Sequence, residues 1–371
     1  MERFYLAALL AARKLKEATV RVLVEKLGTA EAVWRAPIKE LAPYMRDAER
    51  TALVSHRDKN EGLAERIAEQ CEKKHIAVYM EADEKYPPLL KEIFQPPMVL
   101  FCRGELQPFA HRIAMVGARK FTLYGKHVAE ELGAEIASRG ITVVSGGARG
   151  IDTSSHTGAL KTGRTVAVLG CGIDVVYPPE NRALFDEIAE KGAVISEYSP
   201  GTAPLAPFFP ARNRIISGLS MGTLVVEAAE RSGSLITAEL ALSQGRDVFA
   251  VPGSIYSPTS EGCNRLIQQG AKLVRSVDDV LSEYNMAAPK KRSTKKRSSE
   301  EEMPAGLSAE EQKIYELLSL AQAMTVDEII YALHGSGDAA NVAFLLLQME
   351  LRGYVEEDEN HAYCRAVKEA H

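Results

Sequence analysis

The glycine-rich segment Ser145–Asp152 has the composition and position of a phosphate-binding turn. It reads Ser-Gly-Gly-Ala-Arg-Gly-Ile-Asp, follows the apolar run 140–144 and precedes a stretch with helical periodicity. Backbone N–H groups at such a turn and at the start of the next helix converge on one point, and the missing side chains let a phosphate come close. The segment predicts an anion site, although turns of this kind also serve close packing of a strand and a helix.

A second group of candidates ends the preceding apolar run. Gly117, Arg119 and Lys120 follow it directly, at the edge where doubly wound folds place their ligands. The guanidinium of Arg119 suits a phosphate because it can grip two oxygens at once. The alternative is a plain surface cation.

Two further segments offer polar groups. Arg212 and Arg214 flank Asn213, and both arginines cannot point into the core. The Asn213 amide suits a base edge, a sugar or its own turn. Ser232 and Ser234 lie at a turn that opens a helix, where hydroxyl and amide groups converge, and helix capping alone also explains Ser234.

Known catalytic patterns fit poorly. The dinucleotide fingerprint G-x-G-x-x-G is absent after the first strand, and the segment 158–162 only superficially approaches a P-loop. Asp152 and His156 lie one helical turn apart and suit an acid and a base, but no nucleophile or metal cluster joins them, so helix capping is the better account. Five scattered cysteines without a C-x-x-C pair predict buried thiols rather than zinc ligands or disulfides.

These candidates need a scaffold, and the middle of the chain supplies one. Apolar runs alternate there with helical patterns, which predicts an α/β fold with a doubly wound, mostly parallel sheet of the extended Rossmann type. The expected strands are 113–116, 141–144, 166–169, 194–196, 224–226 and 248–251, and the clearest helices are 124–139, 152–161, 181–191 and 235–244. The segment 98–102 is expected to extend this sheet.

Composition and charge bound the organisation. The chain has 371 residues, 46% of them hydrophobic and 26% charged, and carries a net charge of −5. No segment approaches the roughly 20 apolar residues of a membrane span, so a cytoplasmic protein is expected. The predicted domains are a helical module at 1–75, the Rossmann domain at 76–285, a charged linker at 286–304 and a winged helix at 305–371.

The outer parts of the chain leave alternatives open. Residues 1–60 carry twelve Lys or Arg against eight Asp or Glu, and the module resembles helix-hairpin-helix or SAM-like units that touch a nucleic-acid backbone. A docking or dimerisation module with a solvated basic face is the alternative. The linker, with six basic residues before three acidic ones, is expected to be a disordered spacer or a basic tether.

The C-terminal part predicts three helices followed by a hairpin, in the order of a winged helix. Residues 305–365 carry only three Lys or Arg against eleven Asp or Glu. Phosphates would be repelled by this charge, so a protein-contact or regulatory role is favoured over duplex binding.

Taken together, these motifs resemble the bacterial DNA-processing protein A family, also called Smf. The resemblance spans most of the chain and rests on the segments 86–90, 116–119, 145–152 with His156, 210–220, 233–238, 247–253 and 262–271. It implies a protein without catalytic activity or cofactor that binds single-stranded DNA, protects incoming DNA and loads the RecA recombinase during natural transformation or recombination. It also implies a homodimer and contact with single-strand-binding protein.

The predicted DNA-binding set combines the candidates with the residues that match the family. It comprises Gly117, Arg119, Lys120, Ser145, Gly146, Gly147, Ala148, Arg149, Gly150, His156, Arg212, Asn213, Arg214, Ser232 and Ser234. Successive phosphates are expected to sit on its amides and arginines, with the bases turned outward.

Two other function classes remain as alternatives. Rossmann-type phosphoribohydrolases pair a Gly-Gly loop with a later Gly-Thr-x-x-Glu. Here Gly222-Thr223 is followed by Glu227, one residue too late and in an expected strand. The other alternative is a scaffold that binds only protein, which would bind no strand.

Overall fold

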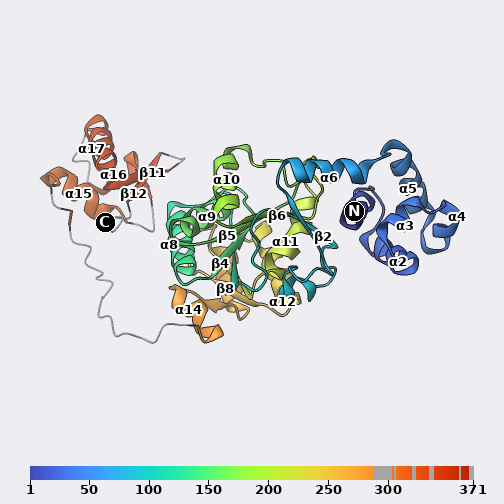
Figure 1. The fold of residues 1–371 in the computed structure, drawn as a ribbon. Coiled ribbons are helices and arrows are strands. Elements are labelled where there is room, and N and C mark those ends of the chain that lie inside the picture. Colours follow the sequence, from blue (N-terminus) through green and yellow to red (C-terminus); the bar gives the residue numbers. More distant parts are fainter. Residues whose placement is uncertain (287–302, 305, 320–322, 334–337, 359–360, 367–371) are drawn as a thin grey trace. The chain divides into compact units, whose positions relative to one another are not determined.

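The computed structural model describes residues 1–286, 303–304, 306–319, 323–333, 338–358 and 361–366 (Figure 1). These residues fall into two compact units. One joins Met1–Arg119 with Ala129–Val277, and the other joins Lys120–Val128 with Asp278–His371. The linker predicted at 286–304 lies outside the described residues except for 286, 303 and 304.

A nine-stranded sheet forms the centre of the first unit, in the order β1-β2-β6-β5-β4-β3-β7-β8-β9. The strands from β6 to β9 along this order pair in parallel, and β1 and β2 add an antiparallel edge. The strands are β1 Ala77–Met80, β2 Val99–Gly104, β3 Arg112–Val116, β4 Thr142–Ser145, β5 Thr165–Leu169, β6 Ala193–Ser196, β7 Gly222–Val225, β8 Asp247–Ala250 and β9 Lys272–Leu273. The doubly wound prediction is confirmed, including the expected extension by the segment at 98–102.

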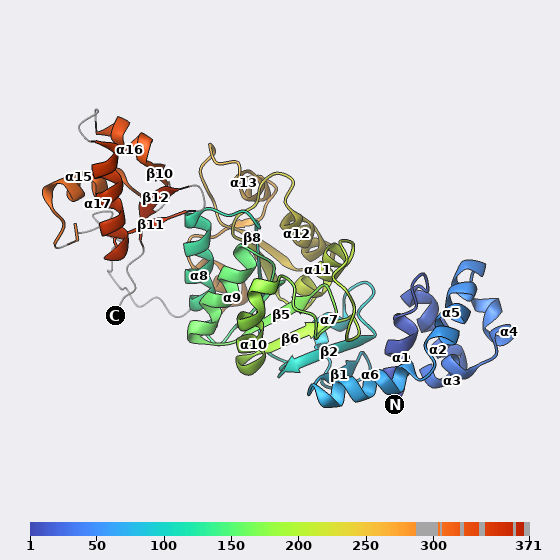
Figure 2. The ribbon, with the colours of Figure 1, turned by 90° about the horizontal axis from the view of Figure 1, so that it is seen from above.

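Helices cover both faces of this sheet (Figure 2). The alternation of side chains along β5 shows which helices share a face: Ala167 and Leu169 join one core with α9 and α10, whereas Val166 and Val168 join another with α11 and α12. The helices are α7 Pro88–Lys91, α8 Leu123–Ser138, α9 Ile151–Thr162, α10 Arg182–Lys191, α11 Phe208–Gly218, α12 Gly233–Ser243 and α13 Glu261–Gln268, with a 3-10 turn at Pro179–Asn181.

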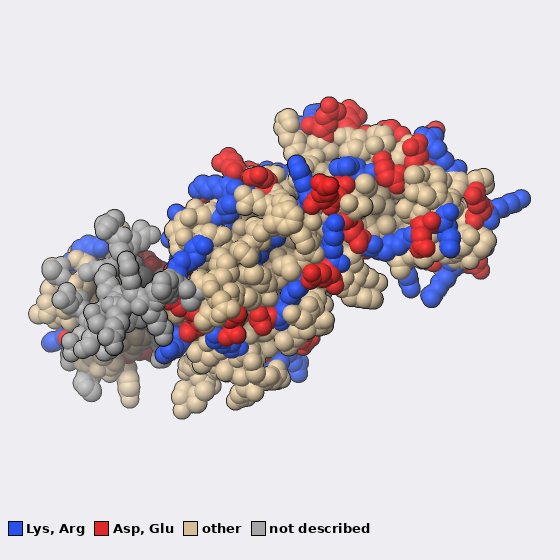
Figure 3. Space-filling model, turned by 60° about the horizontal axis from the view of Figure 1, so that its bottom comes forward, with Lys and Arg blue, Asp and Glu red and all other residues tan. Residues whose placement is uncertain are grey.

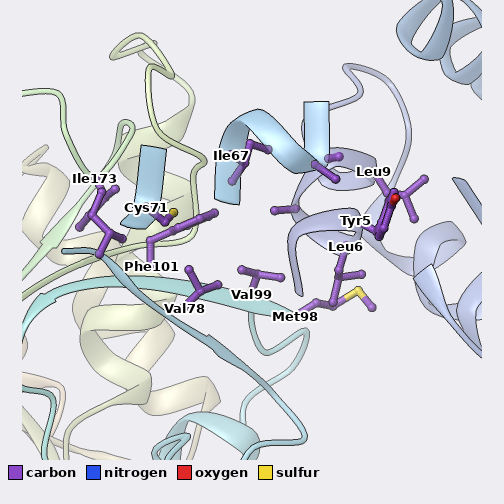
Figure 4. Packing of buried hydrophobic residues seen from close by; sticks show 14 of the residues in the cluster. Tyr5, Leu6, Leu9, Ile67, Cys71, Val78, Met98, Val99, Phe101 and Ile173 are labelled. Carbon is purple, nitrogen blue, oxygen red and sulfur yellow. The ribbon is translucent and has the colours of Figure 1, made fainter. Parts of the chain in front are cut away.

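The N-terminal helices share a hydrophobic core with the antiparallel edge of the sheet. Figure 4 shows Leu6 and Ile67 from the helices beside Val99 and Phe101 from β2. Lys74 also bridges to Asp174 at 2.5 Å. The helices are α1 Glu2–Leu10, α2 Glu17–Leu27, α3 Ala30–Arg35, α4 Ile38–Leu41, α5 Asp47–Lys59 and α6 Leu63–Lys73, with a 3-10 turn at Ala42–Tyr44. One core therefore crosses residue 75, where the sequence places a domain boundary.

The C-terminal elements of the second unit include three helices followed by two antiparallel strands, in the order that the sequence predicts. Ser308 and Thr325 each form a capping box, with Glu311 and Glu328, at the start of α15 and α16. The elements are α14 Val277–Leu281, a 3-10 turn at Ser282–Tyr284, α15 Ala309–Leu317, β10 Met324–Thr325, α16 Val326–Ala332, α17 Ala339–Leu351, β11 Val355–Glu357 and β12 Ala362–Arg365. The three strands pair in the order β10-β12-β11. The winged-helix assignment stays a prediction.

Two expectations from composition can be compared with the structure. All five cysteines are buried free thiols, as predicted. In the described part of the chain, every helix is too short or too polar to cross a bilayer.

Candidate nucleic-acid interface

Two loops at the carboxyl ends of β3 and β4 fit tightly against each other. Gly150, the N-cap of α9, has φ 84° and ψ −132°, and a Cβ atom there would lie 2.3 Å from the carbonyl oxygen of Ala118. The N–H of Ile151 donates to that same oxygen at 3.2 Å. Only glycine fits this conformation and this contact. The predicted turn is therefore attached to the loop that carries Arg119.

The carbonyl groups of the turn are bound from the protein side. Three side chains donate to three successive carbonyls: Arg212 Nη1 to Gly146 at 2.7 Å, Asn181 Nδ2 to Gly147 at 3.0 Å, and Thr153 Oγ1 to Ala148 at 2.8 Å. Within the described part of the chain, no acceptor pairs with the backbone N–H groups of Gly147, Arg149 and Gly150. Gly147 and Gly150 are buried and Arg149 is exposed, so the Arg149 N–H is the one of the three that an anion can reach. The anion site stays a prediction.

A recess opens beside this turn, over the ends of β3, β4 and β5. It encloses about 460 Å³ of empty space, part of it open to solvent. Its lining combines cations, small residues and aromatic rings: Arg119, Gly146, Ala148, Arg149, Gly170, Tyr177, Pro178, Phe209 and Arg212. Four of the predicted residues, from the glycine-rich turn and the β3 loop, thus meet here, together with one arginine of α11.

Two aromatic rings in the recess were missed by the sequence reasoning. The rings of Tyr177 and Phe209 are 5.3 Å apart with 39° between their planes, and the guanidinium of Arg119 lies 5.8 Å from the Phe209 centroid. Tyr177 is 42% exposed, so its ring is accessible. The sequence does carry a signal for these two rings, because each aromatic residue stands next to a proline near the predicted carboxyl edge of the sheet.

Arg149 is exposed and paired. Its Nε donates to the carboxylate of Glu180, which follows β5. The side chains of Arg149 and Glu180 are 66% and 48% exposed, respectively. An exposed pair of this kind is weak and exchanges readily with an incoming anion.

Arg212 supports the recess from below. It is 4% exposed and donates to the carbonyls of Gly146 and Val168. A Cβ atom on Gly146 would lie 2.6 Å from Arg212 Nη2 and 2.7 Å from Asp152 Oδ2, so both side chains flank this glycine. Burial raises the pKa of the Asp152 carboxyl, and Arg212 opposes that rise. Arg212 therefore acts mainly as a buried partner of Asp152 and of the turn.

Two predicted DNA-binding side chains are buried. Ser145 Oγ donates to the carbonyl of Met115 at 2.6 Å. His156 is fully buried, with Nδ1 2.7 Å from Thr165 Oγ1, and burial together with Arg212 lowers its pKa to about 3. Both side chains are therefore out of reach of a ligand in this conformation, and their contact with DNA stays a prediction. The capping interpretation of His156 is wrong, because the residue lies inside α9, whose N-cap is Gly150.

Arg214 points away from the recess. It bonds both carboxylate oxygens of Glu197, at 2.6 and 3.2 Å, and lies 3.8 Å from Glu17 of α2. Residues at positions i and i+2 of a helix are about 200° apart around its axis, so Arg212 and Arg214 face opposite sides of α11. Asn213 lies between them, half-buried, and does not line the recess.

The remaining candidates are not part of the lining of the recess. Lys120 is exposed and not part of the lining. Ser232 is the N-cap of α12, and its Oγ accepts from the backbone N–H of Ser234 at 3.4 Å. The Oγ atoms of Ser232 and Ser234 are 2.7 Å apart. Helix capping therefore accounts for both serines without a ligand. They follow β7, which lies on the opposite side of β3 from β4.

Surface charge is mixed on one face of the molecule. In the face shown by Figure 3, Lys and Arg side chains are interspersed with Asp and Glu instead of forming one basic field. Affinity for a polyanion would then depend on local sites such as the recess.

Comparison with known proteins identifies the family. Residues 77–285 match the family model described as DNA recombination-mediator protein A. The chain belongs to this family. The match covers the sheet and the recess, and it confirms the resemblance seen in the sequence.

Relatives of the recombination-mediator family support the assignment. The DNA processing protein DprA of Streptococcus pneumoniae is 48% identical over 204 residues, which are 54% of this chain and 72% of the relative. A putative DprA of Mycobacterium tuberculosis is 40% identical over 269 residues, 70% of this chain and 67% of the relative.

Solved structures of the family share the fold. The X-ray structure of Streptococcus pneumoniae DprA aligns with a TM-score of 0.66 at 36% identity, covering 76% of this chain and 98% of that one. DNA processing protein A of Helicobacter pylori aligns with a TM-score of 0.52 at 29% identity, covering 57% and 95%. The latter structure concerns the single-stranded DNA binding mode of that protein.

Proposed function

We propose that the recess binds single-stranded DNA. The observation that carries this proposal is the meeting of two exposed guanidiniums, the unpaired Arg149 amide and two aromatic rings in one recess. Phosphates would bind the guanidiniums of Arg119 and Arg149 and the Arg149 amide, while a base stacks on Tyr177 or Phe209. The single-stranded DNA binding mode of the Helicobacter pylori relative supports the same ligand. The rings change the expectation that all bases turn outward.

Such a site recognises a strand largely without regard to sequence. Every base has a face that stacks, and phosphates carry no sequence information. Each phosphate neutralised by a side chain contributes about 0.7 to the log–log dependence of affinity on salt for single strands. Two arginine contacts therefore account for a slope of about 1.4, with further dependence from other cations.

Oligo-dT binding by single-residue variants tests this proposal. Arg119→Ala and Arg149→Ala are each expected to lower the salt slope by about 0.7. Phe209→Ala is expected to lose affinity with the slope unchanged, since stacking is worth about 1–3 kcal/mol per base. Arg164→Ala is the matched control, because Arg164 is half-buried, pairs with Glu105 and precedes β5, at the opposite end of the strands from the recess. Wild-type binding by both arginine variants, with the fold intact, would reject the site.

We also propose that the chain binds its strand without hydrolysing it. Glu227 is the acid nearest to the phosphoribohydrolase pattern. The sequence placed it in a strand, but it lies two residues beyond the end of β7. It is 2% exposed, and Thr259 Oγ1 donates to it at 2.6 Å. Asp152 and His156 are also buried. Incubation with nucleoside monophosphates tests this point, and release of free base would overturn it.

Within the family, we propose a role in delivering the strand to RecA, with two chains acting as a homodimer. The family description as a recombination mediator supports this role. Two recesses would cover a longer strand and raise avidity. RecA filament formation on DNA coated with single-strand-binding protein tests delivery, and sedimentation tests the dimer. Equal stimulation by wild type and by the Arg119→Ala/Arg149→Ala variant would argue against delivery through this site.

A further inference from the structure

A groove on the N-terminal helices forms a second site with the chemistry of an anion receptor. It lies between the loop that joins α1 to α2 and one face of α5, and it encloses about 1100 Å³ of empty space including space open to solvent. Its cations are Arg13, Lys14 and Lys59, its hydrogen-bonding side chains include Thr51, Ser55 and Asn60, and its apolar lining consists of alanines.

The three cations of the groove have no carboxylate partner, unlike several arginines on the N-terminal helices. Arg21, Arg35 and Arg50 each form an ion pair with a carboxylate. In residues 1–286, all of which the structure describes, the side chains of the groove cations have neither an ion pair nor a hydrogen bond, and all three are exposed. No acidic residue lines the groove. Positive charge is therefore left uncompensated in a concave surface.

The groove is held in shape by buried contacts. Glu49 of α5 is 5% exposed, and its carboxylate accepts from the Lys16 N–H at 3.2 Å and from Thr19 Oγ1 at 2.7 Å. Although burial opposes ionisation, these bonds and one from the Arg46 N–H lower the pKa of Glu49. The loop with Arg13 is thus fixed against α5.

Lys14 occupies an unusual backbone conformation. Its φ is 71°, in the left-handed region where glycine or asparagine is normally found. A lysine held there costs roughly 1 kcal/mol, which the surrounding contacts must offset. This conformation accompanies the placement of a cation on the wall of the groove.

We propose that this groove binds the phosphate backbone of the same DNA strand that occupies the recess, outside the length the recess covers. The proposal rests on the strand-binding function argued above. Without a large apolar side chain, the groove lacks the aromatic or aliphatic anchors on which protein interfaces depend. Its only ring, that of His56, is engaged edge-on with Trp34 at 5.8 Å and bonded to the Ala8 carbonyl, so bases have no stacking platform there. Phosphates fit the remaining groups.

A matched pair of triple variants in the full chain tests the proposal. Arg13→Gln/Lys14→Gln/Lys59→Gln removes the groove cations, and Lys26→Gln/Lys39→Gln/Lys73→Gln removes three exposed lysines outside the groove. Both change the net charge equally. The groove variant is expected to lower the salt slope for a long oligo-dT by about 2, three contacts at roughly 0.7 each, while the control keeps the wild-type slope. Circular dichroism verifies the fold.

Binding of oligo-dT of two lengths distinguishes the groove proposal from strand binding in the recess. A short oligo-dT that fills only the recess should bind the groove variant and the wild type alike, whereas Arg119→Ala should lose affinity for both lengths. An unchanged slope for the long oligo-dT in the groove variant overturns the groove site and leaves the recess standing. Equal losses in the groove and control variants also overturn it, because bulk charge would then explain the effect.

Discussion

Replacing Arg212 by methionine separates a supporting role from a direct contact with DNA. The substitution keeps much of the aliphatic volume and removes the guanidinium. Arg212 donates to the carbonyls of Gly146 and Val168, and its charge faces the buried Asp152. A hydrogen bond from a charged donor is worth about 1.5–3 kcal/mol, so the loss of both bonds to buried carbonyls costs about 3–6 kcal/mol. We expect a loss of this size in the free energy of unfolding at neutral pH.

The loss should depend on pH in a defined direction. Burial already raises the pKa of Asp152, and Arg212 opposes the rise, so the Arg212→Met variant raises this pKa further. A carboxyl whose pKa is higher in the folded than in the unfolded state destabilises the fold above the folded pKa, and this cost disappears below the unfolded pKa. The deficit of the variant should therefore shrink as the pH falls from 7 toward 4.

Urea unfolding at several pH values measures this effect, and a second substitution checks its cause. Asp152→Asn removes the carboxylate charge that Arg212→Met leaves uncompensated. The double variant Arg212→Met/Asp152→Asn should therefore lose about 0.5–3 kcal/mol less stability than the sum of the two single variants. Additive single effects, or a deficit that grows toward acid pH, would refute the pairing. Arg212→Met protein that remains folded should retain the wild-type salt slope for oligo-dT, since Arg212 is a buried support of the turn and not a proposed phosphate ligand.

Three other changes test neighbouring features. Gly150→Ala should lower the free energy of unfolding by about 2–6 kcal/mol, from backbone strain and overpacking together, whereas Gly245→Ala, with a positive φ of 69° in open space, should cost only about 1–2 kcal/mol in the same urea titration. Glu180→Gln should tighten oligo-dT binding measured by fluorescence anisotropy, because it frees the neighbouring guanidinium and removes a like charge, and weaker binding would contradict this. Deleting residues 290–371 should leave oligo-dT affinity unchanged, since the acidic C-terminal part is expected to contact protein; a lost affinity would instead assign it to the strand.

The sequence predicted the scaffold better than the orientation of its side chains. Alternating apolar runs define the strands, and the loops at their carboxyl ends must then meet at one edge. The glycines of the turn were therefore assigned to the right place. Which arginine of α11 faces the recess depends on the phase of a helix whose start at Phe208 follows a proline-rich loop, and this phase is set by tertiary contacts.

Pairings between distant segments explain the other differences. Arg149 meets Glu180 only because the loop after β5 folds over the turn. His156 has the sequence context of an exposed helix start, yet its ring packs toward the sheet beside Thr165. Tyr177, in the loop after β5, and Phe209, in the first turn of α11, are 32 residues apart in the chain, so their shared platform is a property of the fold.

The core that joins the N-terminal helices to the sheet has an evolutionary consequence. A module on a flexible tether can be exchanged between relatives without changes elsewhere, because nothing else has adapted to its surface. Here α1 and α6 cover Val99 and Phe101, which are almost completely buried, although the family match begins only at residue 77. A chain that lost these helices would expose an apolar sheet edge and tend to aggregate. Exchange of the helices would therefore require matching changes in the strands that they cover.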